Sequence, residues 1–314
     1  MAYTDREDLN YIGIFYLIGQ NQTPFLNMMG GLNGGKRSTR FQFPVNQNSS
    51  LSSASQNVTN ETAAASAGTA TTYTRSQVYN VAQIMKYDVA VTYAKEAASG
   101  EFSGLNVTAG SNEVITSEYD WQKEMSMRQM AIDTEYSFIQ GTFTDSSLAS
   151  TDMATRGILE AVSSNAVAAG STDLSKDLID ELLRTMADAG SQFRNPVFLA
   201  PAIQKQRISD IYGFAPQSRN VGGLNIDVVE TDFARCGVVY VPQMPAAQLA
   251  LVDMAYCNPV FVPFKSKNDG NTYIMKFEDE YLNGAITGGF WYTQIGLDYG
   301  HEIYHGKITG LTTS

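Results

Sequence analysis

The chain has 314 residues, of which 43% are hydrophobic and 17% are charged, and its formal net charge is -11. Its length suggests about two packed units, and its hydrophobic content excludes a wholly disordered chain. The acidic balance disfavours direct nucleic-acid binding, because no excess of basic side chains is available to neutralise phosphates. The low charged fraction favours a subunit that buries much of its outside, since interface cores are depleted of charge. An Ala- and Ser-rich globule is the plainer alternative.

Cys236 and Cys257 are the two cysteines, and both lie in apolar, strand-like sequence. This pattern predicts buried thiols in a protein made in the cytoplasm, not a disulfide framework. The first residues lack the basic and apolar regions of a signal peptide, and no run approaches about 18 apolar residues. We therefore expect neither export nor membrane insertion.

Residues 1–37 are predicted to form an N-terminal arm. The arm contains an apolar patch at 11–18, then Thr23-Pro24-Phe25-Leu26 and a glycine-rich stretch. With so few apolar residues it cannot close a core alone, so we expect it to pack on a neighbouring subunit or on its own chain.

A β-hairpin is predicted over residues 38–94. A short strand at 39–45 leads into a polar tract at 46–72, which is expected to be a flexible tip. Apolar residues then alternate on one parity through 73–94, which predicts one long strand. Because an isolated ribbon is marginal in water, we expect the hairpin to lie on a neighbouring subunit.

A long helix is predicted at 112–140, ending at Gly141. Its apolar residues recur at helical spacing, namely Trp121, Met125, Ile132, Tyr136 and Ile139. A second helix is predicted to begin with Asp173 as N-cap and to stop at Gly190.

The rest of the chain is predicted to be mainly strands. A strand at 196–200 precedes a helix opened by Pro201, and from 224 onward the sequence is β-rich. This order of elements indicates an α+β fold.

His301-Glu302-Ile303-Tyr304-His305 matches the His-Glu-x-x-His pattern of zinc peptidases. That chemistry needs a helix, on which residues four apart can share a metal, whereas the flanking glycines and β-rich sequence favour a strand. A zinc hydrolase therefore stays as an alternative of a different class, and we expect no metal and no cofactor.

Two further patterns have simpler readings. The stretch from Gly30 to Arg37 resembles a phosphate-binding loop, but Arg37 stands where magnesium needs Ser or Thr, so a flexible hinge is favoured. The carboxylates of Glu278-Asp279-Glu280 and of Asp177, Asp180 and Glu181 are expected to form solvated faces. We do not expect the chain to be an enzyme.

Several short segments follow one another in a characteristic order: Thr23 to Leu26, Glu135 to Gly141, Arg156 to Leu159 with Asn165, Phe198 to Pro201 with Lys205 and Gln206, Glu230 to Phe233 with Gly237, and Tyr304 to Ile308. In this order they resemble the major capsid proteins of tailed bacteriophages with the Hong Kong 97-type fold, in the branch similar to that of phage SU-ten.

The resemblance implies an α+β fold with an N-terminal arm at 1–37, an extended hairpin loop at 38–94 and a long spine helix at 112–141 within a peripheral segment at 95–149. It further implies an axial domain at 150–250, with 251–314 mainly forming peripheral-domain strands. Lys–Asn crosslinking, known in some members, is not expected, because the tract 46–72 contains no lysine.

The implied function is a virion shell subunit that self-assembles as pentamers and hexamers and encloses double-stranded DNA without sequence-specific binding. Separate scaffolding, portal and cement proteins are possible partners, and assembly is expected in the host cytoplasm. An encapsulin-like shell storing a cargo protein is the alternative. Aromatic and arginine side chains are the expected intersubunit contacts: Tyr11, Ile14, Phe15, Phe25, Arg40, Phe41, Phe43 and Arg75.

Overall fold

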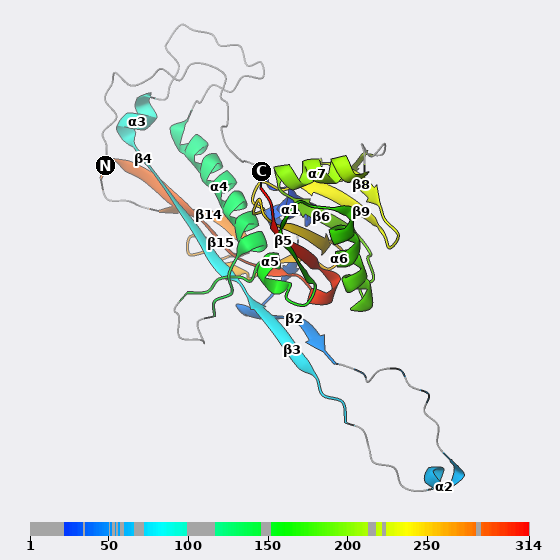
Figure 1. Ribbon diagram of the computed structural model, residues 1–314. Coiled ribbons are helices and arrows are strands. Elements are labelled where there is room, and N and C mark those ends of the chain that lie inside the picture. The colour runs from blue at the N-terminus through cyan, green and yellow to red at the C-terminus, as the bar shows by residue number, and fades with distance from the viewer. Residues whose placement is uncertain are drawn as a thin grey trace.

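The computed structural model places a two-stranded hairpin beside a body built on two sheets (Figure 1). It describes residues 22–33, 35–49, 51, 54, 56, 60–65, 72–98, 117–145, 152–212, 218–221, 224–280 and 284–313. Tyr11, Ile14 and Phe15 therefore lie outside the described residues. Within the described part of the chain, no helix is both long and apolar enough to cross a bilayer.

The first sheet has β15 (Ile286–Asp298) as its central strand. Strand β4 (Gln83–Thr92) pairs along one edge of β15, and β14 (Met275–Glu280) and β11 (Asn258–Phe261) pair along the other. The fifth strand, β1 (Lys36–Arg37), runs parallel to β11. Helix α4 (Glu118–Gln140) crosses one face of this sheet, as Figure 1 shows.

The second sheet has seven strands, in the order β5-β16-β10-β6-β9-β8-β7. Their bounds are β5 Ala166–Thr172, β16 Gly306–Leu311, β10 Leu249–Asp253, β6 Pro196–Ala200, β9 Arg235–Tyr240, β8 Leu224–Glu230 and β7 Ser218–Val221. Helices α6 (Lys176–Asp188) and α7 (Ala202–Tyr212) pack on it. Because β10 spans residue 250 and β16 belongs to this sheet, the boundary expected at 250 does not separate the two sheets.

Apart from the hairpin strands, the remaining described elements are short. They are α1 (Pro24–Met28), η1 (Gly31–Asn33), α2 (Glu61–Ala64), α3 (Tyr93–Ala98), α5 (Ile158–Ala161), β12 (Phe264–Lys265), β13 (Thr272–Tyr273) and η3 (Glu302–Tyr304). The predicted α+β class is confirmed.

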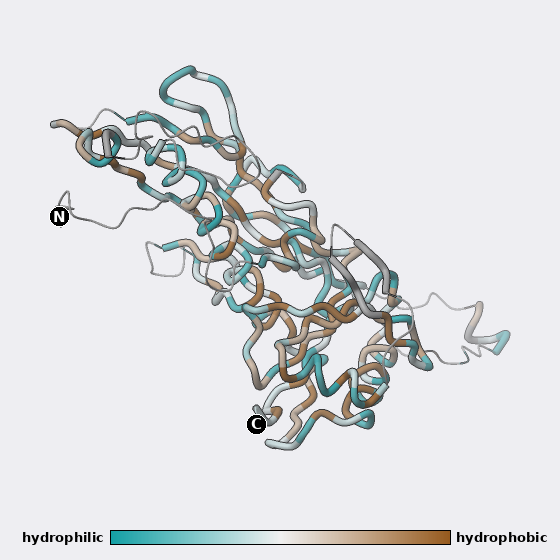
Figure 2. The backbone as a smooth tube through the Cα atoms, turned by 90° about the horizontal axis from the view of Figure 1, so that it is seen from above, coloured by the Kyte–Doolittle hydropathy of each residue, from teal (hydrophilic) through white to brown (hydrophobic). Residues whose placement is uncertain are grey.

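One hydrophobic core links the two sheets. It takes Phe261 and Ile295 from the first sheet, Val252 from the second and Phe138 from α4. A second core lies between the seven-stranded sheet and helices α6 and α7. Strands β6 and β10 are therefore buried on both faces, and Figure 2 shows hydrophobic segments running through the middle of the body. Both cysteines are free and buried, as predicted.

The single long strand predicted at 73–94 is wrong. It divides at Ala82 into β3 (Ser76–Val81), which pairs with β2 (Gln42–Asn48), and β4, which belongs to the body. The expected alternation of buried and exposed residues nevertheless holds along β4, because one face of that strand packs under α4. The hairpin is accordingly shorter than predicted, and β2 already includes residues 46–48 of the expected tip.

Helix α4 confirms the predicted long helix but differs in its bounds and in its buried face. Ser117 caps its N-terminus by accepting a hydrogen bond from the Asp120 N–H, and Gly141 ends it. The predicted stripe placed Tyr136 inward, yet this side chain is 52% exposed. The buried face is instead centred on Met130, Glu135 and Phe138. The apolar pattern missed this face because the polar residue Glu135 occupies one of its core positions.

Two other local predictions need correction. Ser175, not Asp173, caps α6, and Asp173 lies instead beside Arg207, with 2.9 Å between their side-chain atoms. The stretch predicted as a hinge at 30–37 is docked on the body through β1, and the Lys36 ammonium contacts the Asp298 carboxylate at 2.6 Å. A Cβ at Gly35 would come within 2.2 Å of the Pro259 carbonyl oxygen, so only glycine allows the chain to approach β11 this closely.

Candidate functional site: the hairpin and its root

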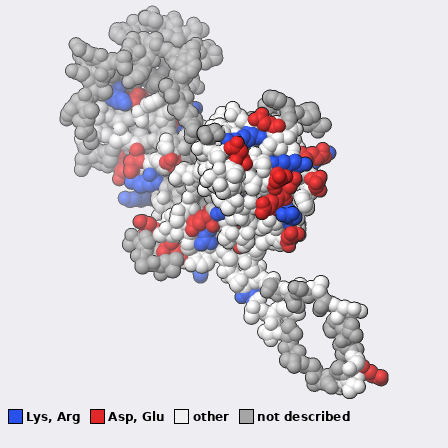
Figure 3. Space-filling model, viewed as in Figure 1, with Lys and Arg blue, Asp and Glu red and all other residues white. Residues whose placement is uncertain are grey.

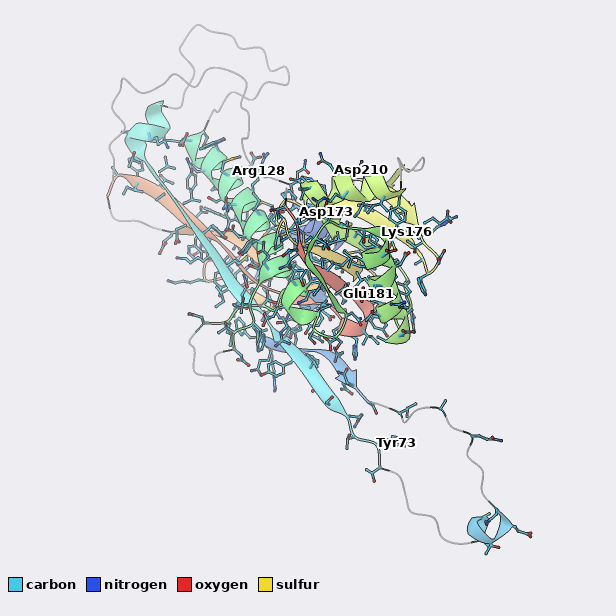
Figure 4. All side chains as sticks on the ribbon, in the orientation of Figure 1. Tyr73, Arg128, Asp173, Lys176, Glu181 and Asp210 are labelled. Carbon is cyan, nitrogen blue, oxygen red and sulfur yellow. The ribbon has the colours of Figure 1, made fainter. Side chains whose placement is uncertain are left out.

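The hairpin presents one continuous exposed face. Tyr73, Arg75, Gln77 and Tyr79 alternate along one side of the chain through β3, and all four are exposed. Their cross-strand neighbours Pro44 and Gln47 are exposed as well. We call these six residues the ribbon face. Figure 4 shows Tyr73 well away from the body.

The opposite side of the hairpin is covered at its root. Phe43 is 5% exposed and packs with Ala82, Val260 and Val262 of the body. A Cβ at Gly296 would come within 2.8 Å of the Phe43 ring, so glycine is needed there to admit the ring. Phe43 therefore belongs to the core of its own chain and is withdrawn as an intersubunit contact. Its neighbour Phe41 is half-buried.

Of the other proposed contacts, the two arginines remain available. Arg40 and Arg75 are both exposed, and neither forms an ion pair with another described residue. The described hairpin residues 38–48 and 72–81 contain these two cations and no carboxylate, in a chain whose net charge is -11. Acidic side chains instead gather on the body over the α6 and α7 side (Figure 3).

Phe25 is fully buried, and its position corrects the expectation that it contacts another subunit. It joins the core that links the two sheets, together with Leu26. The Leu26 N–H donates a 3.2 Å hydrogen bond to Glu135 Oε2, which ties the arm to α4. The other carboxyl oxygen, Oε1, is buried and has no hydrogen-bond partner among the residues that the structure describes. Burial raises the pKa of Glu135 to about 8, although backbone N–H groups of Leu26 and Phe25 oppose the shift.

We expect Glu135→Gln to remove the loss of stability that ionisation of Glu135 causes at alkaline pH. Because the folded-state pKa lies above the ordinary value, folding favours the protonated acid, and stability falls as pH rises from about 4.5 to about 8. The loss should reach roughly 2 to 4 kcal/mol. The variant keeps an acceptor for Leu26 and does not ionise, so denaturant unfolding should find it more stable than the wild type at alkaline pH.

Glu124→Gln is the matched control, since Glu124 lies on the same helix but is exposed and pairs with Arg128. A surface ion pair contributes at most about 1 kcal/mol, so this variant should follow the wild-type pH profile. Parallel profiles for wild type and Glu135→Gln would contradict the prediction.

The side chains of the zinc-peptidase pattern form hydrogen bonds within the chain. Residues 302–304 form the 3-10 helix η3, so the strand expected there is wrong. Both ring nitrogens of His305 are engaged, since Nδ1 accepts from the Asp253 N–H at 3.2 Å and Nε2 donates to the Tyr299 carbonyl at 2.5 Å. Among the described residues, no group of three His, Cys, Asp or Glu side chains could hold a metal ion.

The remaining titratable groups of these patterns also have local partners. The Glu302 carboxylate accepts hydrogen bonds from the backbone and hydroxyl groups of Ser163 and Ser164. Those bonds hold the pKa of Glu302 below its ordinary value, although burial opposes them. Glu278, expected in a solvated cluster, is 5% exposed, with Lys276 at 3.8 Å.

Residues 2–312 match the family model of the SU10 major capsid protein. The chain belongs to this family. It is a structural subunit of a virion shell, as the resemblance in the sequence predicted. No curated protein matches the chain.

Solved structures place the capsid protein in the Hong Kong 97-type fold. The capsid asymmetric unit of cyanophage A-1(L) has a TM-score of 0.63 at 13% identity, over 97% of this chain and 98% of that chain. The capsid of the native GTA particle has a TM-score of 0.61 at 12% identity, covering 96% and 94%. The holo-SrpI encapsulin complex of Synechococcus elongatus PCC 7942 has a TM-score of 0.59 at 11% identity, covering 100% and 98%.

Sequence reasoning missed the two polar residues that anchor the hairpin and the arm of the capsid protein, Asn80 and Glu135. Asn80 lies in the alternating stretch on the parity expected to face solvent, and it is fully buried. Glu135 stands among charged and polar neighbours of α4. Because both are buried through partners far away in the sequence, no local pattern distinguishes them from surface residues.

Proposed function

We propose that the capsid protein joins its neighbours in the shell through the ribbon face of the hairpin. The observation that carries this proposal is the exposure of Tyr73, Arg75 and Tyr79 on a ribbon that lies beside the body. Two strands with so little packing are marginal alone, and tyrosine and arginine are the side chains that most often anchor interfaces. An acidic surface on a second copy is the complementary partner for Arg40 and Arg75.

The same proposal assigns roles to the rest of the chain. The region from about 150 to 250, with β16, forms the axial domain, and the five-stranded sheet with α4 forms the peripheral domain. The subunits form pentamers and hexamers in the host cytoplasm, with separate scaffolding, portal and cement proteins as partners. The shell encloses double-stranded DNA without reading its sequence, and the chain has no enzymatic activity.

Charge reversal at the ribbon face tests the proposal. We expect Arg75→Glu to raise the protein concentration needed for shell formation by about tenfold, which corresponds to losing about 1.4 kcal/mol of contact energy. The melting temperature of the unassembled chain should not change, because Arg75 is exposed. Sedimentation velocity and negative-stain microscopy report assembly.

Arg184→Glu is the matched control, because Arg184 is an exposed arginine on α6 and the change in net charge is identical. Its assembly should stay closer to wild type. Equal impairment by both variants would point to net charge and contradict a specific role of the ribbon face.

The likeness to the encapsulin supports a second candidate for what the shell encloses, namely a cargo protein. A shared fold does not by itself determine what is enclosed. Particles that hold a packaged protein and no nuclease-protected DNA would favour that candidate over a DNA-filled shell.

A further inference from the structure

The hairpin leaves the body beside one fully buried amide side chain, that of Asn80. Its Nδ2 group donates to Thr155 Oγ1 at 3.1 Å, to the Leu297 carbonyl at 2.7 Å and to the Arg156 carbonyl at 3.3 Å. Its Oδ1 atom accepts from the Arg156 N–H at 2.8 Å and from the adjacent Val81 N–H at 2.9 Å. The amide thus connects the end of β3 to two other segments of the chain.

These two segments are also connected to each other. The Leu297 N–H of β15 donates to Thr155 Oγ1 at 3.1 Å, so Asn80, Thr155 and Leu297 form a closed set of hydrogen bonds. A closed set resists rotation better than separate bonds, because each partner is held in place by the others.

Other contacts surround this set. Gln42 donates to the Asp145 carboxylate at 2.6 Å, and Asn46 donates to the Gly300 carbonyl at 2.8 Å. The register shifts between Pro44 and Asn46, and beyond Asn46 the described strand residues of the ribbon are exposed or half-buried. The contacts that direct the hairpin are therefore concentrated at its root.

We infer that Asn80 is a positioning residue that fixes the direction in which the hairpin leaves the body. In the shell, that direction determines where a neighbouring copy receives the ribbon face; this second step rests on the proposed function, whereas the first concerns a single chain. Asparagine suits the position because one side chain supplies both the donors and the acceptor that these backbone groups need. An apolar side chain would leave them buried and unpaired.

Distance measurements between spin labels at Gln47→Cys on β2 and Glu124→Cys on α4 test the inference. Both positions are exposed, whereas Cys236 and Cys257 are buried. Burial raises the pKa of Cys236 to about 12 and raises the pKa of Cys257 as well, so the native thiols should not react with the label. Labelled full-length chain is mixed with excess unlabelled chain, so that distances within one chain dominate.

We expect one narrow distance distribution for the otherwise unchanged chain. Asn80→Ala should make it about twofold broader, because the hairpin loses its main restraint. Thr155→Val removes the hydroxyl that Asn80 and Leu297 share while keeping the side-chain shape, and it should broaden the distribution less. If Asn80→Ala does not fold, Thr155→Val alone decides the question.

Asn165→Ala is the matched control. Asn165 is 1% exposed and donates at 3.0 Å to the carbonyls of Ile303 and His305, neither of which is a hairpin residue. The width should stay at the wild-type value in this variant. Wild-type widths in Asn80→Ala and Thr155→Val, or equal broadening in Asn165→Ala, would overturn the inference.

Assembly of the unlabelled variants separates the two proposals. Shells of uneven diameter from Asn80→Ala, beside uniform shells from Asn165→Ala, would support both steps of the inference. If the wild type forms shells but the distance distributions do not respond, the inference fails and the proposed function stands. If the distributions respond but the ribbon-face variant assembles normally, the proposed function fails while the role of Asn80 in the single chain stands.

Discussion

Gly157→Val is expected to destabilise the body by about 3 kcal/mol or more. A Cβ at Gly157 would come within 2.6 Å of the Gly141 nitrogen and 2.8 Å of the Ile139 carbonyl oxygen. Both are backbone atoms at the end of α4, so no side chain can rotate away to make room. The Gly157 N–H also donates to the Gly141 carbonyl at 2.8 Å, and the clash would break this contact. Denaturant unfolding of the unassembled chain measures the loss.

Gly190→Ala is the control, because it measures the cost of an unfavourable backbone conformation without a steric clash. Gly190 has a φ of +93°, and no atom of the described neighbouring residues lies within 4 Å of an added Cβ. The alanine variant should therefore lose only about 1 to 2 kcal/mol, the cost of a left-handed conformation. A smaller loss for Gly157→Val than for Gly190→Ala would show that the close approach at the end of α4 can relax.

His305→Ala is expected to cost about 3 to 5 kcal/mol at neutral pH. The side chain is fully buried, and its removal leaves the Asp253 N–H and the Tyr299 carbonyl without partners. Asp253 is the last residue of β10 in the second sheet, and Tyr299 directly follows β15 of the first sheet. The loss should therefore affect the whole body. Thermal unfolding of the unassembled chain checks the size of the effect.

The cost of His305→Ala should shrink in acid. Burial lowers the pKa of His305 to about 4, although the bond to Tyr299 opposes the shift. Folding therefore favours neutral imidazole, and its stabilisation is complete above about 6.5 and is lost as pH falls towards about 4. The difference between wild type and variant should narrow by about 3 kcal/mol over this window. A difference that stays constant with pH would contradict the lowered pKa.

The sequence predicted those elements whose signals are local. The terminating glycines Gly141 and Gly190, and Pro201 before α7, mark helix ends through their own backbone properties, and all three lie where predicted. The family resemblance supplied the order of arm, hairpin, long helix and two domains. The alternation along β4 likewise follows from one covered and one open face.

The missing information was long-range. Nothing near Ala82 in the sequence shows that the chain changes partners there, because the strand that pairs with β4 lies about 200 residues later. Phe25 and Phe43 were predicted to face other subunits, since aromatic residues in an arm or hairpin suit either an interface or a core. The bond from Leu26 to Glu135 holds the segment of Phe25 against α4, and Gly296 leaves room for the Phe43 ring. These distant residues place both aromatic side chains in the core.

The central place of β15 and β16 has a consequence for synthesis of the protein. Strand β15 joins β4 to β14 and β11, and β16 lies between β5 and β10. Neither sheet can therefore close before residues 286–311 have left the ribosome. Until then the nascent chain already contains the hairpin sequence but has no folded body. We therefore expect subunits to associate through the body only after β15 and β16 have been made.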